Sequence, residues 1–250
     1  MSVTLDELIT ISSSEERFLQ IFQNFCSQSG QAFLLAHRTL LLACYHNPGL
    51  APKVSGKTPE AVARAWWSKY HRSFESRISQ RISKPPGTTA DPIINTIIGT
   101  RLGELTIGQL EQIKHAHQIS MSAENILGLL LEEFLAQELV DYGWYCGWGD
   151  SVRHVDFCNV DGSLLQIKNR SNSENSSSAR VRINQPIEMW YRVNANTGAY
   201  RWPDLNEKYK TNRFSEENFV AFVQSVLSKN PEALALDIKN PWKPLSDSSS

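Results

Sequence analysis

Apolar residues recur at helical spacing through the first half of the chain, between recognisable start and stop signals. A capping box at Ser13-Ser14-Glu15-Glu16 and a stop at Gly30 bound the first predicted helix. A second apolar helix runs from Phe33 to about His46. Further helices are predicted from Thr58-Pro59-Glu60 to before Pro85, from Asp91-Pro92 through Ile97, and over 105–117.

The pattern then changes from helical to mixed. Ser122 is the predicted cap of a helix over 123–140, which carries the pair Glu132-Glu133. Short runs rich in β-branched and aromatic residues follow, and a final helix is predicted over 215–228. The predicted strands are 144–146, the hairpin within 152–170, 187–193, and a return over 199–202 after the turn 194–198. The order indicates an α+β fold with a helical N-terminal part, 1–119, followed by a mixed-sheet core with flanking helices, 120–250.

The hairpin is the most informative segment because its turn fixes the register. Asn159-Val160-Asp161-Gly162 suits a type I turn followed by a left-handed glycine, and a three-residue loop would pair Asn159 with Ser163. Asp156 would then lie opposite Gln166, on the same face as Lys168. A two-residue Asp-Gly loop would instead pair Asp156 with Ile167 and turn the acid away from the lysine.

These residue types on one face suit a metal-dependent phosphodiesterase. Mg²⁺ prefers oxygen ligands, and Asp156, the Gln166 amide and the Ile167 carbonyl are candidate donors. Lys168 is a candidate for activating the attacking water and offsetting transition-state charge. The amide at Gln166 removes one charge, so weaker metal binding is expected than with two acids. The alternative is an ordinary polar hairpin with Asp156 and Lys168 facing solvent or each other.

The preceding helix supplies a further candidate acid. Glu132 lies one turn after Gly128, which would permit close backbone approach, whereas Glu133 lies nearer the apolar stripe of Ile126, Leu130 and Phe134. Either acid alone would ordinarily face solvent. His154 shares the expected strand face with Asp156 and is a weaker candidate base.

Composition excludes several classes of protein. With 41% hydrophobic and 20% charged residues the chain is globular, and no apolar run approaches a membrane span. The first residues have no signal-peptide character, and the four cysteines lack metal or disulfide spacing, so a reduced cytoplasmic protein is expected. The formal net charge is −1, so no global basic signal points to nucleic acid.

Local charge gives a different indication. Between Lys53 and Lys84 there are eight basic residues and two acids. Arg180 and Arg182 share a predicted strand face, and arginine reads guanine in the major groove. The polar segment before them, 169–178, is either a DNA-reading loop or a flexible linker.

Together these residues resemble the PD-(D/E)XK nuclease superfamily, with an acid on a helix, Asp on a strand, and Gln-x-Lys on the next. The run 165–170 followed by 173–178 and Arg180-Val181-Arg182 more closely resembles the SinI-type family of type II restriction endonucleases, as does the helix from Glu124 through Glu133. The resemblance is firmest over 122–192. Val155 replaces the superfamily's proline, and Gln166 departs from its usual acid.

The resemblance implies an Mg²⁺-dependent homodimer that cuts both strands of duplex DNA at a near-palindromic site, GG(A/T)CC for the SinI-type family. The implied catalytic residues are Asp156, Gln166, Lys168 and Glu132. The implied DNA-binding residues are Arg170, Asn175, Ser177, Arg180 and Arg182. Two alternatives remain: a structure-specific repair or recombination nuclease, and a non-catalytic DNA-binding protein.

Overall fold

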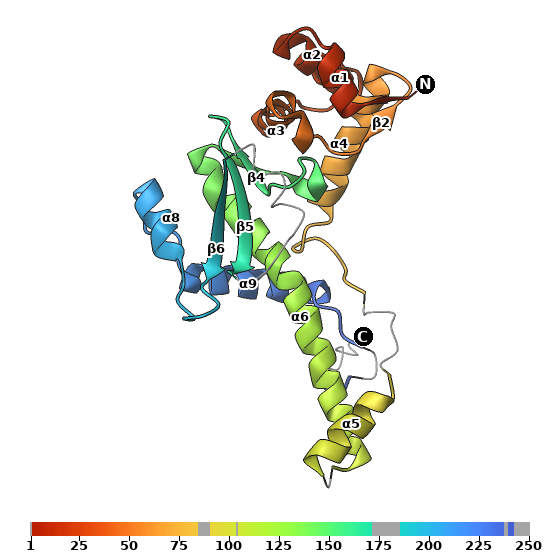
Figure 1. The fold of residues 1–250 in the computed structure, drawn as a ribbon, viewed down its shortest axis with the longest axis vertical. Helices are drawn as coiled ribbons and strands as arrows, with labels where there is room; N and C mark the ends of the chain where they lie inside the picture. The colour runs from red at the N-terminus through yellow and green to blue at the C-terminus, as the bar shows by residue number, and fades with distance from the viewer. Residues whose placement is uncertain (1, 85–90, 104, 172–185, 238–239, 243–250) are drawn as a thin grey trace, which may run out of the picture.

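A four-stranded mixed sheet lies between two groups of helices, in a computed structural model that describes residues 2–84, 91–103, 105–171, 186–237 and 240–242 (Figure 1). The strands are β3 (Trp144–Cys146), β4 (Phe157–Asn159), β5 (Leu164–Arg170) and β6 (Ile187–Val193), and they are ordered β3-β4-β5-β6. The first two pairings are antiparallel, and β5 and β6 run parallel. The predicted α+β class is confirmed.

The N-terminal helices are α1 (Leu5–Ile11), α2 (Glu15–Gln28), α3 (Leu35–His46) and α4 (Pro59–Glu75). Two of them, α2 and α3, form where the sequence predicts them, α1 was not predicted, and α4 ends at Glu75, well before the predicted end near Pro85. Ser14 caps α2 by accepting a hydrogen bond from the Arg17 N–H, and Gly30 follows with a positive φ of 68°. Thr58 caps α4 in the same way. A two-stranded sheet of β1 (Val3–Thr4) and β2 (Ser55–Gly56) was not predicted.

The prediction of two separate helices over 105–140 is wrong. After α5 (Ile93–Leu102), a single helix α6 (Ile107–Leu139) runs unbroken through the whole segment. Thr106 caps it, and Ser122 lies buried in its interior. The sequence has no proline between Pro92 and Pro186 that would break the helix. A serine alone does not end a helix that is stabilised by tertiary packing. The division at residue 119 stays a prediction, and α6 passes through it.

Each face of the sheet belongs to a different hydrophobic core. One core joins α1 to α4 with Cys158, Leu164 and Ile187. The other joins α6 and the C-terminal helices with the opposite face, which includes Phe157, Leu165, Ile167 and Trp190. Trp66 and Trp67 are buried in the first core. The hairpin strands therefore depend on packing from both halves of the chain.

The predicted return strand over 199–202 is wrong, although the turn before it forms. Asn194 O accepts from Gly198 N at 2.8 Å, but beyond it there is only an isolated bridge from Val193 to Tyr200. Trp202-Pro203 then begins α8 (Trp202–Tyr209), because proline suits the first turn of a helix and cannot donate to a ladder. The last helix, α9 (Glu216–Lys229), agrees with the prediction.

Short 3-10 turns complete the described chain. They are η1 (Pro48–Leu50), η2 (Val140–Tyr142), η3 (Trp148–Asp150) and η4 (Pro231–Ala233). All four cysteines are buried and free, so no disulfide forms. Within the described residues no helix is both long and apolar enough to cross a bilayer.

Candidate active site

The turn of the hairpin has the predicted geometry. Asn159 N donates to Ser163 O at 2.9 Å, and Gly162 N donates to Asn159 O at 3.0 Å. Gly162 has a φ of 89°, as the position after a type I turn requires. The strand register, Phe157 to Leu165 and Cys158 to Leu164, belongs to the three-residue loop. The alternative register, which would turn Asp156 away from Lys168, is excluded.

Asp156 lies one residue before β4, because the chain leaves the sheet there. Its backbone N–H still donates to Leu165 O at 2.9 Å. Its Oδ2 accepts the backbone N–H of Ile167 at 2.7 Å, so the carboxylate replaces a ladder partner on β5. The carboxylate is thus held against β5 by one oxygen.

The segment before Asp156 is not the strand that the sequence predicted. His154 has a φ of 68°, so strand alternation does not apply to it and its expected face-sharing with Asp156 has no basis. The backbone bonds of this segment go to the N-terminal half instead: Arg153 N donates to Leu50 O at 2.8 Å, and Ser151 O accepts from Trp66 Nε1 at 2.9 Å. These bonds replace the expected pairing with β5.

Gln166 and Lys168 share one face of β5. They pair in register with Met189 and Tyr191 of β6, two residues apart in each strand. Gln166 is buried, and Lys168 is half-buried. The positive charge of Lys168 acts on Asp156, where it favours the charged carboxylate and lowers its pKa. The acid and the lysine are therefore close, on the side that the three-residue loop requires.

The two helix acids have different surroundings. Glu133 is buried and paired: its carboxylate lies 3.3 Å from Arg77 Nε and accepts the Ser79 N–H at 3.1 Å. Glu132 is half-buried, and its electrostatic partners are Asp156 and Asp150. Glu133 thus anchors the segment after α4, while Glu132 faces the hairpin. Gly128 has no atom near its Cβ position in the described chain, so the expected close backbone approach is not seen.

Glu132, Asp150 and Asp156 lie close enough to affect one another electrostatically. Burial, together with the negative charges of Asp156 and Asp150, raises the pKa of Glu132 to about 8. Burial also raises the pKa of Asp156 to about 6, against the lowering effect of the Ile167 N–H. A bound cation would favour the charged form of both groups.

Asp150 is a residue that sequence reasoning missed. It lies in η3, far from the helix acid in sequence, with a φ of 54°. Preceding Gly149, φ 66°, contacts α4 so closely that a Cβ there would lie 1.9 Å from Ser73 Oγ. Gly149 and Asp150 are residue types that favour a turn. The neighbouring sequence does not show that this turn would pack against α4.

Sequence reasoning also missed a hydrogen-bond network that connects β5 to β6 and the C-terminal helices. Asn169 Oδ1 accepts from Arg192 Nε at 2.9 Å, and Arg192 also pairs with Glu216 of α9. Glu216 in turn accepts from Trp202 Nε1 at 2.9 Å. This network fixes the strand residue next to Lys168 to β6 and to two C-terminal helices.

The expected DNA-reading residues are mostly outside the described chain. Arg170 is exposed at the end of β5. Asn175, Ser177, Arg180 and Arg182 lie outside the described residues, so their assignment stays a prediction.

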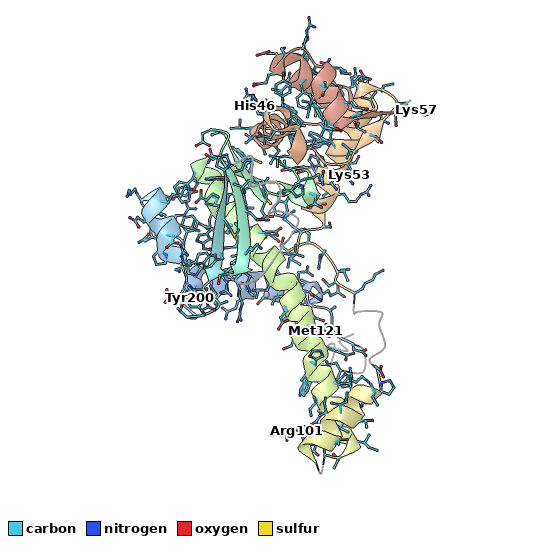
Figure 2. All side chains as sticks on the ribbon, in the orientation of Figure 1. His46, Lys53, Lys57, Arg101, Met121 and Tyr200 are labelled. Carbon is cyan, nitrogen blue, oxygen red and sulfur yellow. The ribbon has the colours of Figure 1, made fainter. Side chains whose placement is uncertain are left out.

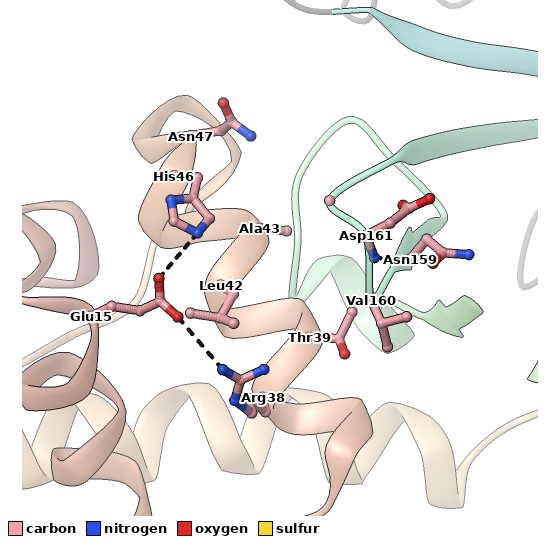
Figure 3. A pocket seen from close by; sticks show the side chains of 11 residues that line it. Glu15, Arg38, Thr39, Leu42, Ala43, His46, Asn47, Asn159, Val160 and Asp161 are labelled. Atoms are coloured by element: carbon pink, nitrogen blue, oxygen red, sulfur yellow. Dashed lines mark hydrogen bonds and ion pairs between the residues drawn. The ribbon is translucent and has the colours of Figure 1, made fainter. Parts of the chain in front are cut away.

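A pocket of about 310 Å³ lies at the tip of the hairpin, against α3 (Figure 3). Glu15 is held there between Arg38 at 3.6 Å and His46 at 3.3 Å, opposite the turn residues Asn159 and Asp161. The acid is already paired with two side chains, and none of the candidate catalytic residues lines this pocket.

The donor set suits a hard cation without a cluster of acids. Among the described residues no three His, Cys, Asp or Glu side chains form a metal-binding group. Asp156, the Gln166 amide oxygen and the Ile167 carbonyl include only one acid, and Mg²⁺ keeps several waters as ligands. Glu132 lies beside this set, where it could accept a hydrogen bond from a bound water.

Comparison with known proteins places the chain among nucleases. A family model described as SinI restriction endonuclease matches residues 32–229. The type II restriction enzyme Eco47I of Escherichia coli is 38% identical over 163 residues, which is 63% of this chain and 70% of that protein. The type II restriction enzyme SinI of Salmonella infantis is 38% identical over 160 residues, 62% of this chain and 69% of that protein.

Proposed function

This chain belongs to the SinI restriction endonuclease family, and from that membership we propose that it cuts duplex DNA with Mg²⁺, as a homodimer, at GG(A/T)CC or a related near-palindromic site. The observation that carries the proposal is the placement of Asp156 beside Lys168, with Glu132 coupled to the same carboxylate. The family's resemblance to PD-(D/E)XK enzymes supports the same roles for these residues.

The proposed division of labour follows from the surroundings of each group. Asp156, the Gln166 amide oxygen and the Ile167 carbonyl would hold Mg²⁺, which when bound supplies an activated water and neutralises phosphate charge. Lys168 stabilises negative charge that develops on the phosphate in the transition state. Glu132 orients water at the edge of the site. Arg170, and by the resemblance Asn175, Ser177, Arg180 and Arg182, contact DNA.

The decisive experiment is digestion of a plasmid of known sequence. Discrete fragments with Mg²⁺, no cleavage with EDTA, and fragment ends that share GG(A/T)CC are expected. Ends without a shared sequence would favour the repair-nuclease alternative. Intact plasmid across a range of salt and divalent metals would contradict nuclease function altogether.

Lys168→Ala tests the catalytic assignment. Loss of a preorganised positive charge at the transition state lowers cleavage by about 100-fold or more, while DNA binding at low salt changes little. Lys229→Ala is the matched control, because Lys229 is exposed at the end of α9. Equal activity of the two variants would remove Lys168 from the mechanism.

A further inference from the structure

The helical arm made of α5 and the first turns of α6, described over residues 91–103 and 105–121, extends away from the body of the molecule (Figure 1). No residue of α5 is buried, and the first buried residue of α6 is Ser122. Arg101 and Met121 mark the far end and the base of the arm in Figure 2. The arm therefore contributes nothing to either core.

Large aliphatic side chains nevertheless cover the arm. Six of them are between 37% and 83% exposed: Ile93, Ile94, Ile97, Leu102, Ile107 and Ile113. Ile93, Ile94 and Ile97 follow each other on one side of α5. A surface of this kind on a projecting element indicates a binding face.

The arm is also incompletely packed by itself. A helix of ten residues such as α5 is marginal in water without tertiary packing. A cavity of about 490 Å³ opens between α5 and α6, lined by Ile94, Ile98 and Ile113 among others. Within the described part of the chain, no surface buries the apolar side chains of these two helices.

We propose that the arm binds the arm of a second copy of this chain, and that the two α5–α6 hairpins pack as a four-helix interface. The proposal deepens the proposed function, on which it rests for the homodimer, by naming the element that joins the two subunits. A two-fold axis through the paired arms gives an isologous contact, in which each surface faces its own copy.

The area suits such a contact. Burial of apolar surface stabilises by about 25 cal/mol per Å², and burial of one methylene by about 0.8 kcal/mol, so each aliphatic carbon has about 30 Å² of surface. With their exposed fractions, the six side chains together expose on the order of 400 Å² of apolar surface. A standard interface buries about 800 Å² per partner, of which somewhat more than half, about 450 Å², is non-polar. The arm alone approaches that apolar requirement.

Charge favours a second copy over DNA as the occupant. Residues 91–121 contain three acids and two basic residues, so the arm is close to neutral. DNA binding needs several lysines and arginines facing the phosphates, and the arm has only Arg101 and Lys114. A near-neutral surface with both signs can meet its own copy without net repulsion.

Sedimentation velocity of the full chain over a concentration series tests the proposal. Wild type is expected to dimerise, and the double variant Ile97→Glu with Ile107→Glu is expected to weaken dimerisation by about 100-fold or more, because it places charges in an apolar contact. Ile11→Glu is the control, since Ile11 is 65% exposed at the end of α1. A monomeric wild type, an unchanged double variant, or equal weakening by the control would overturn the proposal.

Cross-linking provides a second measurement that does not depend on a disruptive substitution. The four native cysteines are buried, so Ile97→Cys introduces an exposed thiol. A short bis-maleimide is expected to join two Ile97→Cys chains efficiently and to leave Ile11→Cys chains single. Failure to cross-link across a series of spacer lengths, or equal cross-linking at both positions, would place the contact elsewhere.

Plasmid cleavage separates this proposal from the proposed function. A wild type that dimerises through the arm but leaves DNA intact would retain the interface and contradict the nuclease assignment. A wild type that cuts DNA while its arm variants remain dimers would retain the nuclease assignment and contradict the interface.

Discussion

Glu132 and Glu133 are adjacent on α6, but their side chains have different surroundings. Glu133 forms an ion pair with Arg77 and accepts a hydrogen bond from the Ser79 N–H. Glu132 instead lies close to two other acids, whose negative charges raise its pKa. The sequence placed both acids on the right helix and favoured Glu132 for the site. Only packing shows that Glu133 is paired, because Arg77 and Ser79 lie more than fifty positions away.

Substituting each glutamate should therefore have opposite effects. Glu132→Gln removes like-charge repulsion, so we expect unchanged or higher stability and at least about tenfold lower cleavage. Glu133→Gln leaves Arg77 without its carboxylate partner and should lower the free energy of unfolding by about 1–3 kcal/mol. Urea unfolding and cleavage rates measure both, with exposed Glu124→Gln as control. A strongly destabilised Glu132→Gln would contradict the distinction.

Buried histidine gives the N-terminal core a defined response to pH. Burial and the neighbouring His71 lower the pKa of His37 to about 4, below its ordinary value of 6.5. The unfolded chain binds the proton first on acidification, so stability falls as the pH decreases from about 6.5 toward 4. Its Nδ1 accepts the Leu34 N–H at 3.0 Å, which requires neutral imidazole.

Replacing His37 with Gln should flatten this dependence. We expect wild type to lose on the order of 3 kcal/mol of stability between pH 7 and 4 from this group, and His37→Gln to lose correspondingly less. Urea midpoints at several pH values measure the difference, and exposed His117→Gln provides the comparison. A His37→Gln slope equal to that of wild type would assign the acid sensitivity to other groups.

Elements rather than single residues explain where prediction from sequence succeeded. Strands β3 and β6, the hairpin turn, and helices α2, α3 and α9 have local signals such as caps, a left-handed glycine and alternation, and they formed where expected. Helix α4 begins at its predicted cap but ends at Glu75, before the predicted end. The first hairpin strand, predicted from Val152, begins only at Phe157, because Leu50 binds the backbone of Arg153 and Trp66 binds that of neighbouring Ser151. Local pattern cannot report such long-range bonds.

The contact between α4 and η3 is the element-scale feature most open to test. Gly149→Ala would place a methyl group against Ser73 at a φ of 66°, so both sterics and backbone conformation oppose it. We expect Gly149→Ala to shift Asp150 and the start of the hairpin. The equilibrium constant for folding and the rate constant for cleavage should each fall by about tenfold or more.

Gly128→Ala is the matched control for that change. Its Cβ would meet no described atom, and alanine is the better helix former, so a gain of about 0.5–1 kcal/mol is expected. Thermal unfolding of the two variants gives the comparison. A Gly149→Ala protein as stable and active as wild type would show that this contact does not position the site.

At the scale of the whole molecule, the two halves share the sheet. Cys158, Leu164 and Ile187 complete the core of α1 to α4, while the opposite face of the same strands completes the core of α6. The sequence predicted a helical N-terminal part beside a catalytic core, and it could not show that one face of the catalytic sheet would be covered by that part. Hydrophobic periodicity identifies a face but not its partner.

Removal of residues 1–54 should therefore damage the catalytic half. The deletion uncovers apolar residues on one side of the sheet, so we expect aggregation or loss of the cooperative unfolding transition rather than a stable smaller nuclease. Size-exclusion chromatography and thermal unfolding of the truncated chain measure this. A monomeric, cooperatively folding product would establish that the C-terminal part folds independently.

The bond from the Ile167 N–H to Asp156 Oδ2 has a consequence for the proposed cation site. The carboxylate is oriented by the strand before any ion arrives, so little rotational freedom is lost on binding. Affinity for the cation is then governed mainly by charge and dehydration, and depletion of the ion should leave the fold intact while activity stops, in contrast to proteins whose metal nucleates their folding.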